Sequence, residues 1–543
     1  KQFSSRQKMV GVHSLLKSPR AWIWCKPRLR RCRSLAPQAV APRYLQSALH
    51  KDLASAARDG ARDPADVFAA FWRHCEVFSP DVSDIDACLN ALVNCRPKST
   101  VEHGRHLVRV LECLEATLLR DLHFDGEAFR CLTTSAWALA RLVRQRPLPP
   151  AEVLRRLPAA FARLEAAARP WLGECFLPRY LALMAWSFAK SGAGSPAFFE
   201  ALGDAALGRS QRLEPREVAN LCWAFAAVKM RHKLLAQMAS RVAASGDRMS
   251  QFSEQDLSCC AWGFATLLLN HGKFFDCISS AAETRSDELS AQGIVNLTWA
   301  FAAIGSRPDV VPLLMDRVSS GRLWEDLEPR GSAMLLWSLT KMRFDNSRAE
   351  LFYMSLADRC IVTRAELFHA QDTANSLWAF ATCRFHHQAA FAALAQRAAQ
   401  IIRTFNPQAL ANAVWSYARM KVPAPSFFEA AEAEAQQRQM RSWPPHSIAT
   451  LCWSCSEVGR QPLALLAPLT AELQARAKDF NDVDLATLAA VLGPERGWPQ
   501  EVQALRRAAL ARIQGEGRRR HLPRTQEALE VASLIARVDH DAS

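Results

Sequence analysis

The sequence predicts an all-α protein, a right-handed α-solenoid of about nine to ten helix-turn-helix repeats of 37–41 residues. Two observations predict this class. The heptapeptide Leu-Cys-Trp-Ala-Phe-Ala-Ala around Trp223 returns nearly unchanged around Trp299, and more loosely around Trp378 and Trp415. The chain is also rich in Ala, Leu and Arg, which favour helix, while β-branched residues dominate no long segment. A segment that recurs at a fixed period indicates repeat units that contact only their neighbours.

Tryptophans mark the repeats along the chain. Their successive spacings are 49, 37, 39, 37, 38, 41, 37 and 38 residues, which a generic helical bundle does not explain. The anchor residues are Trp137, Trp186, Trp223, Trp262, Trp299, Trp337, Trp378, Trp415 and Trp453. A tenth, degenerate unit fits around Ala490, and residues 85–93 resemble a first unit that has lost its Trp. Terminal repeats of a solenoid are often atypical because they cap it.

Each unit is predicted to hold two helices. The first contains the Trp and begins at helix-start residues such as Glu214-Pro215, Ser253-Glu254 and Asn406-Pro407. It ends near a turn such as the one at Gly305, and the second helix follows, as in residues 195–202 and 425–431. The array is predicted to span residues 126–493, between a divergent helical cap at 52–125 and a C-terminal helical cap at 494–543.

The net charge of +15 is concentrated in residues 1–51, which hold 12 Lys and Arg and no acidic residue. The remainder carries 56 basic and 53 acidic groups, a net charge of only +3. An acid-free, Arg-rich segment is typical of an organellar transit peptide, and also of a basic arm that neutralises phosphates. In the second interpretation the RNA contacts come from Arg28, Arg30, Arg31 and Arg33. An uninformative basic or disordered tail is the alternative.

Successive residues of a helix are turned by about 100°, so the position of a residue relative to the Trp tells which side of the first helix it occupies. One side is predicted to face the core, and another is not. Two residues after the Trp the side chain is large in most units, as at Phe225, and five before it is mostly apolar, as at Val218. The residues one and three after the Trp are small, as at Gly263, so that a neighbouring helix can approach. We expect the Trp itself to be mainly a packing residue, with base stacking as the minority interpretation.

Polar residues recur on the side that the Trp faces. The residues seven positions before each Trp are called the upstream row, and none of them is acidic or apolar in the nine units. They are Arg130, Arg179, Arg216, Gln255, Gln292, Arg330, Gln371, Gln408 and His446. Asparagine stands three positions before the Trp in four units, and these residues are called the asparagine row: Asn220, Asn296, Asn375 and Asn412. Stacked units would align these side chains so that they contact base edges or phosphates unit by unit. Alternatively, the first row caps neighbouring carbonyls or is solvated, and the second bonds the next unit's backbone.

Nothing in the sequence indicates catalysis. There is no Gly-rich phosphate loop, no His-Glu-x-x-His and no Gly-x-Ser-x-Gly, so we expect no enzyme, no cofactor and no metal. Cys452 and Cys455 form a CxxC without a second pair, inside a Trp helix, which favours core packing over a metal site. Cys222, Cys259, Cys260 and Cys452 occupy apolar positions, which is typical of buried free thiols. The uncharged run 289–306 matches the repeat and is not expected to span a membrane.

The phrase Val218-Ala-Asn-Leu-Cys-Trp-Ala-Phe-Ala-Ala-Val228 resembles the first helix of octotricopeptide repeats, and of the similar repeats in RAP-domain and FAST-kinase-like organellar proteins. Residues 294–304 and 373–383 resemble it equally well, and the likeness covers about residues 126–493. No RAP domain is recognisable in residues 494–543. The resemblance implies an α-solenoid that binds single-stranded RNA in mitochondria or plastids.

We therefore expect an organellar RNA-binding protein that braces or matures rRNA or transcripts, in the mitochondrial matrix or alternatively in a plastid. The small charge outside residues 1–51 favours a place within a ribonucleoprotein assembly, such as the mitochondrial ribosome, with other proteins as partners and no small-molecule substrate. The alternative is a protein-binding α-solenoid scaffold in an organellar complex with no direct RNA contact.

Overall fold

The computed structural model describes residues 63–491 apart from short internal stretches, together with Leu49, Asp52 and Leu53. The stretches left out are 77–79, 96–99, 120–125, 146–147, 174–176, 246–247, 322, 345, 439 and most of 461–478. The described part of the chain consists of helices joined by turns and loops and contains no strand, as the sequence predicts. The predicted basic segment 1–51 and the predicted C-terminal cap 494–543 lie almost wholly outside the described residues.

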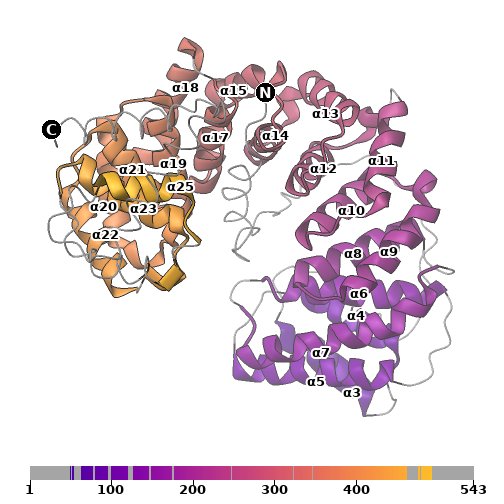
Figure 1. Ribbon diagram of the computed structural model, residues 1–543. Coiled ribbons are helices and arrows are strands. Elements are labelled where there is room, and N and C mark those ends of the chain that lie inside the picture. Colours follow the sequence, from indigo (N-terminus) through magenta and orange to yellow (C-terminus); the bar gives the residue numbers. More distant parts are fainter. Residues whose placement is uncertain are drawn as a thin grey trace, which may run out of the picture. The chain divides into compact units, whose positions relative to one another are not determined.

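The chain divides into an N-terminal unit, residues 1–288, and a C-terminal unit, residues 289–543. In the N-terminal unit α3 (Pro64–Cys75) precedes helices that alternate between the two positions of a repeat (Figure 1). The first helices are α4 (Val82–Val93), α6 (Gly126–Leu142), α8 (Pro178–Ser191), α10 (Pro215–Ala227) and α12 (Glu254–Thr266). The second helices are α5 (Val101–Leu118), α7 (Ala151–Ala168), α9 (Pro196–Gly208), α11 (Lys233–Ala244) and α13 (Gly272–Thr284).

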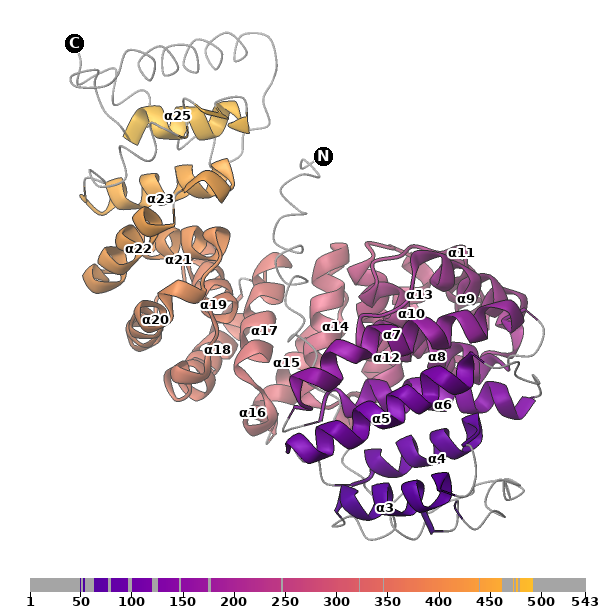
Figure 2. The same ribbon diagram turned by 90° about the horizontal axis from the view of Figure 1, so that it is seen from below.

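The C-terminal unit continues the same alternation (Figure 2). Its first helices are α14 (Ala291–Ile304), α17 (Pro329–Lys341), α19 (Ala370–Cys383), α21 (Pro407–Met420), α23 (Pro445–Glu457) and α25 (Asp482–Val491). Its second helices are α15 (Val310–Ser320), α18 (Ser347–Leu356), α20 (Gln388–Gln400) and α22 (Pro425–Gln437). Short turns such as η4 (Ser210–Arg212) and η9 (Ile402–Thr404), or the helix α16 (Leu323–Asp326), precede many first helices. These boundaries confirm the predicted all-α helical-repeat solenoid.

First helices begin where local chemistry satisfies their free N–H groups. Proline occupies the first turn of α8, α10, α17, α21 and α23, where a missing N–H costs no hydrogen bond. Ser253 forms a capping box with Asp256, and the side chain of Asn406 accepts from the amide of Ala409. The helix starts predicted from these residues are therefore confirmed.

Within each unit, the first helix of one repeat packs directly on the first helix of the next. The large side chain two residues after the Trp is buried, as at Phe225, and so is the apolar residue five before it, as at Val218. A Cβ placed on Gly263, one residue after Trp262, would lie 2.7 Å from the carbonyl oxygen of Cys222 on the preceding first helix. The small residues beside the Trp therefore permit the close helix approach that the sequence predicts.

Every first helix from α8 to α23 ends in a left-handed residue six positions after its Trp, with φ between 53° and 77°. The next residue donates its N–H to the carbonyl two positions after the Trp, as Phe385 does to Phe380 at 2.9 Å. The left-handed residues are Gly192, Lys229, Leu268, Gly305, Arg343, Arg384, Lys421 and Gly459. A residue with a side chain pays roughly 1 kcal/mol for this backbone relative to glycine. A cationic side chain beside the helix C-terminus stabilises the helix by about 0.3–1 kcal/mol, which roughly offsets this strain. Helix stability therefore does not favour a cationic residue over glycine at this position.

Arginines in or just after several second helices bond to the segment that precedes the first helix of the same repeat. Their guanidinium groups donate to carbonyl groups in the segment immediately before the first helix. The pairs are Arg248 with Leu213, Arg285 with Phe252, Arg397 with Phe368, Arg438 with Phe405, and Arg476 with Trp443. These loop carbonyls lie where regular structure offers no partner, and an unpaired buried carbonyl costs about 1–3 kcal/mol. These five arginines therefore have a structural role.

Candidate functional site

The anchor tryptophans of three consecutive repeats lie against one another. The ring centroids of Trp186 and Trp223 are 6.0 Å apart, and those of Trp223 and Trp262 are 6.4 Å apart. The ammonium of Lys190 lies 5.2 Å from the Trp223 ring, and the Arg141 guanidinium lies 5.3 Å from the Trp137 ring. These contacts define a tryptophan row on the first-helix face, with cations over some of its rings.

The tryptophan row is buried in the middle of the array and more open elsewhere. Trp223, Trp262 and Trp299 are buried, as expected for packing residues. The other anchors are half-buried: Trp137, Trp186, Trp337, Trp378, Trp415 and Trp453. The interpretation of the Trp as a packing residue is thus confirmed for three anchors, and the remaining six present part of a ring at the surface.

In the C-terminal unit the upstream row and the asparagine row meet through hydrogen bonds. Gln292 donates from Nε2 to Oδ1 of Asn296 at 2.8 Å, and Gln371 donates to Asn375 at the same distance. Both asparagines are buried, whereas Gln292 is exposed and Gln371 is half-buried. Each pair leaves the Gln Oε1 and the Asn Nδ2 without a partner among the described residues. We call these two couples the amide pairs.

Other members of the upstream row face carboxylates on a neighbouring repeat. Arg130 lies 3.2 Å from Asp86 on α4, and His446 lies 3.3 Å from Asp484 on α25. Burial raises the pKa of Asp86 to about 6, against hydrogen bonds from Thr134 and the charge of Arg130 that lower it. Burial also lowers the pKa of Arg330, while the charge of Asp372 raises it. These three residues help to join repeats, which is close to the structural alternative for this row.

The remaining residues of the two rows are open to solvent or half-buried. Arg216 and Gln255 are exposed, Gln408 is half-buried, and the exposed Arg179 stacks on Tyr180 at 4.8 Å. Asn220 and Asn412 are half-buried, and their side-chain amide groups form no hydrogen bond with another described residue. Arg28, Arg30, Arg31 and Arg33 lie outside the described residues. Within each unit the two rows thus lie on the first helices, but their members have different surroundings.

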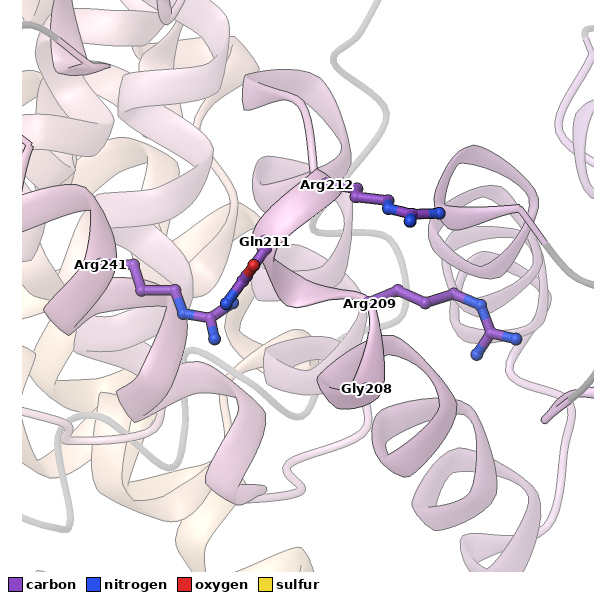
Figure 3. A pocket seen from close by; sticks show the side chains of 5 residues that line it. All are labelled: Gly208, Arg209, Gln211, Arg212 and Arg241. Atoms are coloured by element: carbon purple, nitrogen blue, oxygen red, sulfur yellow. The ribbon is translucent and has the colours of Figure 1, made fainter.

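A cavity of about 340 Å³ lies where α9 ends, and it is lined by Gly208, Arg209, Gln211, Arg212 and Arg241 (Figure 3). Arg209 donates to the carbonyl groups of Ala205 and Gly173, and Arg241 donates to the hydroxyl of Ser210. Arg212 and Gln211 are exposed, and no carboxylate lines the cavity. The cavity is basic, but two of its three arginines are engaged with the fold.

Glu200, Asp204 and His232 are the one group in the described part of the chain with the composition of a metal site, their ligand atoms lying within 4.8 Å. The Nδ1 atom of His232 accepts the amide N–H of Leu234, so the ring proton lies on Nε2. That Nε2 lies 3.5 Å from a carboxylate oxygen of Glu200 and 3.5 Å from one of Asp204, without a hydrogen bond to either. A protonated nitrogen cannot ligate a metal, so the group is best described as a helix cap tied to the preceding second helix.

The cysteines show no metal-binding or disulfide arrangement within the described residues. Cys222, Cys260, Cys452 and Cys455 are buried, and burial raises the pKa of Cys452 to about 12. Cys259 is only half-buried, which corrects the prediction of full burial, because it lies on the polar side of α12 three residues before Trp262. None of the described helices is long and apolar enough to cross a bilayer.

Two recurrent groups of residues were not predicted from the sequence. The arginines that bind loop carbonyls have a signal, because they recur at about the repeat length: Arg248 and Arg285 each stand 14 residues before the next anchor Trp, and Arg438 stands 15 before it. The left-handed residues also have a signal, because they stand six positions after the Trp and follow the same helix ending in which other units place Gly. Three of them, Arg343, Arg384 and Lys421, are exposed cations in consecutive repeats.

The fold and this face define an all-α helical-repeat protein of the solenoid class. Residues 309–452, just over a quarter of the chain, match the family described as RNA-editing substrate-binding complex 6 protein. A segment of 98 residues is 32% identical to a protein of Oryza sativa subsp. japonica described as RAP domain-containing protein, chloroplastic. That similarity covers 18% of this chain and 14% of the rice protein, so the chain spans a small part of the relative's length.

Proposed function

We propose that the protein binds single-stranded RNA in a mitochondrion or plastid, along the face formed by its first helices, and that it is a binding protein rather than an enzyme. The observation that carries the proposal is the amide pairs, Gln292 with Asn296 and Gln371 with Asn375, beside the tryptophan row. The description of the family matched by residues 309–452 names an RNA-editing substrate-binding complex, and the rice relative is described as chloroplastic. Both descriptions support an organellar RNA ligand.

The amide pairs have the chemistry to contact bases. In each pair the internal hydrogen bond fixes both side chains and leaves one carbonyl oxygen and one amide N–H₂ unused. An acceptor next to a donor is complementary to the edge of a nucleobase, which single-stranded RNA exposes. Because the bond holds the groups in place before RNA arrives, less rotamer entropy is lost on binding.

The small net charge of the repeat region favours binding to RNA that is already held close to the protein over long-range electrostatic attraction of free RNA. Outside residues 1–51 the net charge is only +3, and many arginines bind loop carbonyls. We therefore propose that the protein works within a ribonucleoprotein assembly, such as a mitochondrial ribosome, where it braces or helps to mature rRNA or transcripts. The basic N-terminal segment would add phosphate contacts where it is retained.

The proposal is tested by crosslinking the purified full chain to organellar RNA and sequencing the recovered RNA. The test variant carries Gln292→Ala and Gln371→Ala, and the matched control carries Gln396→Ala and Gln400→Ala, two exposed glutamines of α20. With about 1 kcal/mol lost at each of the two amides, we expect the test variant to bind roughly 30-fold more weakly and the control to match the wild type. Equal recovery by both variants would exclude the amide pairs, and no recovery by the wild type would exclude RNA binding.

A further inference from the structure

We propose that Arg343, Arg384 and Lys421 form a track that binds the phosphates of a single-stranded RNA backbone. We call these three residues the phosphate track. The inference rests on the proposed function and extends it, because it assigns phosphate binding to residues outside both rows. The three side chains lie at the C-terminal ends of α17, α19 and α21, three first helices that pack consecutively.

The track is regular because the helix ending is regular. Each of the three residues stands six positions after its Trp and has φ between 53° and 56°. In each case the following residue bonds back to the helix: Phe344 to Leu339, Phe385 to Phe380, and Val422 to Tyr417. Neighbouring packed helices are about 8–10 Å apart, so the cations recur at that interval along one edge.

Nothing among the described residues neutralises the track. All three side chains are exposed, and none makes a side-chain hydrogen bond or ion pair with a described residue. Residues 378–387 and 415–428, around Arg384 and Lys421, contain no Asp or Glu, and the acidic residue nearest to Arg343 in the sequence is Asp345, which lies outside the described residues. Lys341 and Arg419, four residues after their Trp, add positive charge in the last turn of α17 and α21. Such an edge attracts a polyanion.

Helix capping does not explain the cations. Gly192, Gly305 and Gly459 occupy the same position in other repeats, and the same backbone hydrogen bonds form there. Glycine takes this conformation without strain, whereas Arg and Lys do not. Strained backbone conformations are concentrated at functional sites, where a side chain is needed in spite of the strain. The row of unpaired cations suggests that the need here is a phosphate ligand.

The track and the upstream row are separate contact regions. They lie at opposite ends of the first helices, 13 residues apart in each repeat, which corresponds to roughly 20 Å along a helix. The asparagine row and the partly open tryptophans lie between them. An RNA strand crossing this face can therefore place its backbone along the track with its bases towards the asparagine row.

The test is the salt dependence of binding to fluorescein-labelled polyuridylate, measured by anisotropy with the full chain. The variant carries Arg343→Gly, Arg384→Gly and Lys421→Gly, substitutions that remove the charge and relieve backbone strain, so the fold should be at least as stable. Leu268→Gly is the control, because it relieves the same strain without changing charge. We expect the slope of log K against log salt to become shallower by about 2, and affinity at 0.1 M salt to fall roughly 10- to 100-fold.

A second variant tests the track by gain of function. Gly305→Lys places a fourth cation at the same position on α14, where an added Cβ meets no atom within 4 Å. We expect a slope steeper by about 0.7, together with a lower melting temperature because of the positive φ. The changes should be equal on polythymidylate DNA, because phosphates and not 2′-hydroxyls are contacted. An unchanged slope in the triple variant overturns the track alone, whereas absence of binding by the wild type overturns the proposed function as well.

Discussion

The Nη1 atom of Arg130 lies 3.2 Å from Oδ2 of Asp86, whose side chain is only 4% exposed. This pair joins α4, which lacks the anchor Trp, to α6, the first helix that has one. Thr134 and Ser135 on α6 donate to the same carboxylate, as does Asn90 on α4. A residue of the upstream row therefore holds two repeats together at the N-terminal end of the array.

The Asp86 network predicts a pH dependence of stability. Burial raises the pKa of Asp86 from 3.8 to about 6 in the folded protein, so folding favours the protonated form. The group's stabilising contribution is complete below about pH 4 and is lost as pH rises through about 6, a loss of about 3 kcal/mol. We expect Asp86→Asn to flatten the rise in melting temperature that accompanies acidification over this range. Melting curves followed by circular dichroism would contradict this if Asp86→Asn and the exposed-site control Glu350→Gln kept equal pH slopes.

The arginines that bind loop carbonyls predict a large and specific loss of stability. Arg438 donates to the carbonyl groups of Phe405, Ile402 and Arg403 and pairs with Glu434. Arg438→Ala leaves these acceptors unpaired and should cost about 1–3 kcal/mol, visible as a lower urea midpoint. Arg403→Ala, at an exposed arginine of the same loop, is the matched control and should be nearly neutral. Equal midpoints for the two variants would show that the loop carbonyls find other partners.

The close approach of α10 and α12 predicts that Gly263 tolerates no side chain. An added Cβ would lie 2.7 Å from the backbone oxygen of Cys222, so the two helices must separate. We expect Gly263→Ala to lower stability by about 1–3 kcal/mol in thermal unfolding. Gly272→Ala, in the first turn of α13 where nothing lies within 4 Å, should leave stability unchanged or raise it slightly. A neutral Gly263→Ala would mean that the helix pair is less tightly packed than the structure shows.

The left-handed position at Leu268 predicts opposite effects of two substitutions. Leu268 has φ of 53° and a side chain that is 43% exposed. Leu268→Gly should raise the melting temperature, with a gain of about 0.5 kcal/mol after the entropy cost of glycine. Leu268→Val should lower it, because a β-branched residue is least compatible with this conformation. A lower melting temperature for the glycine variant would show that the Leu268 side chain contributes more than the strain costs.

Much of the repeat architecture could be predicted because its signals are local. The Trp spacing identified the repeats, and Pro, Ser and Asn before the first helices identified where they begin. Large and small residues around each Trp identified the core wall and the close helix contacts, as Phe225 and Gly263 show. Regular units make such inferences reliable, because each position is sampled several times.

The surroundings of the predicted site residues could not be deduced in this way. Gln292 and Arg330 share a position in the repeat. Gln292 bonds an asparagine of its own helix, whereas the charge of Arg330 interacts with the buried carboxylate of Asp372 on the next first helix. The difference depends on what the neighbouring repeat supplies across the helix contact. The same position of the repeat thus has different partners in different repeats.

The sequence by itself determined the helical repeats, their boundaries and the side of each first helix that bears polar residues, because periodicity and capping act within a few turns of one helix. Only the tertiary structure decided which cations are used within the fold and which are left exposed. That division depends on carbonyl groups and carboxylates that are distant in sequence and meet the arginines only when repeats stack. The physical reason is that a guanidinium group binds whichever acceptor packing brings within reach, and packing is a property of neighbouring repeats.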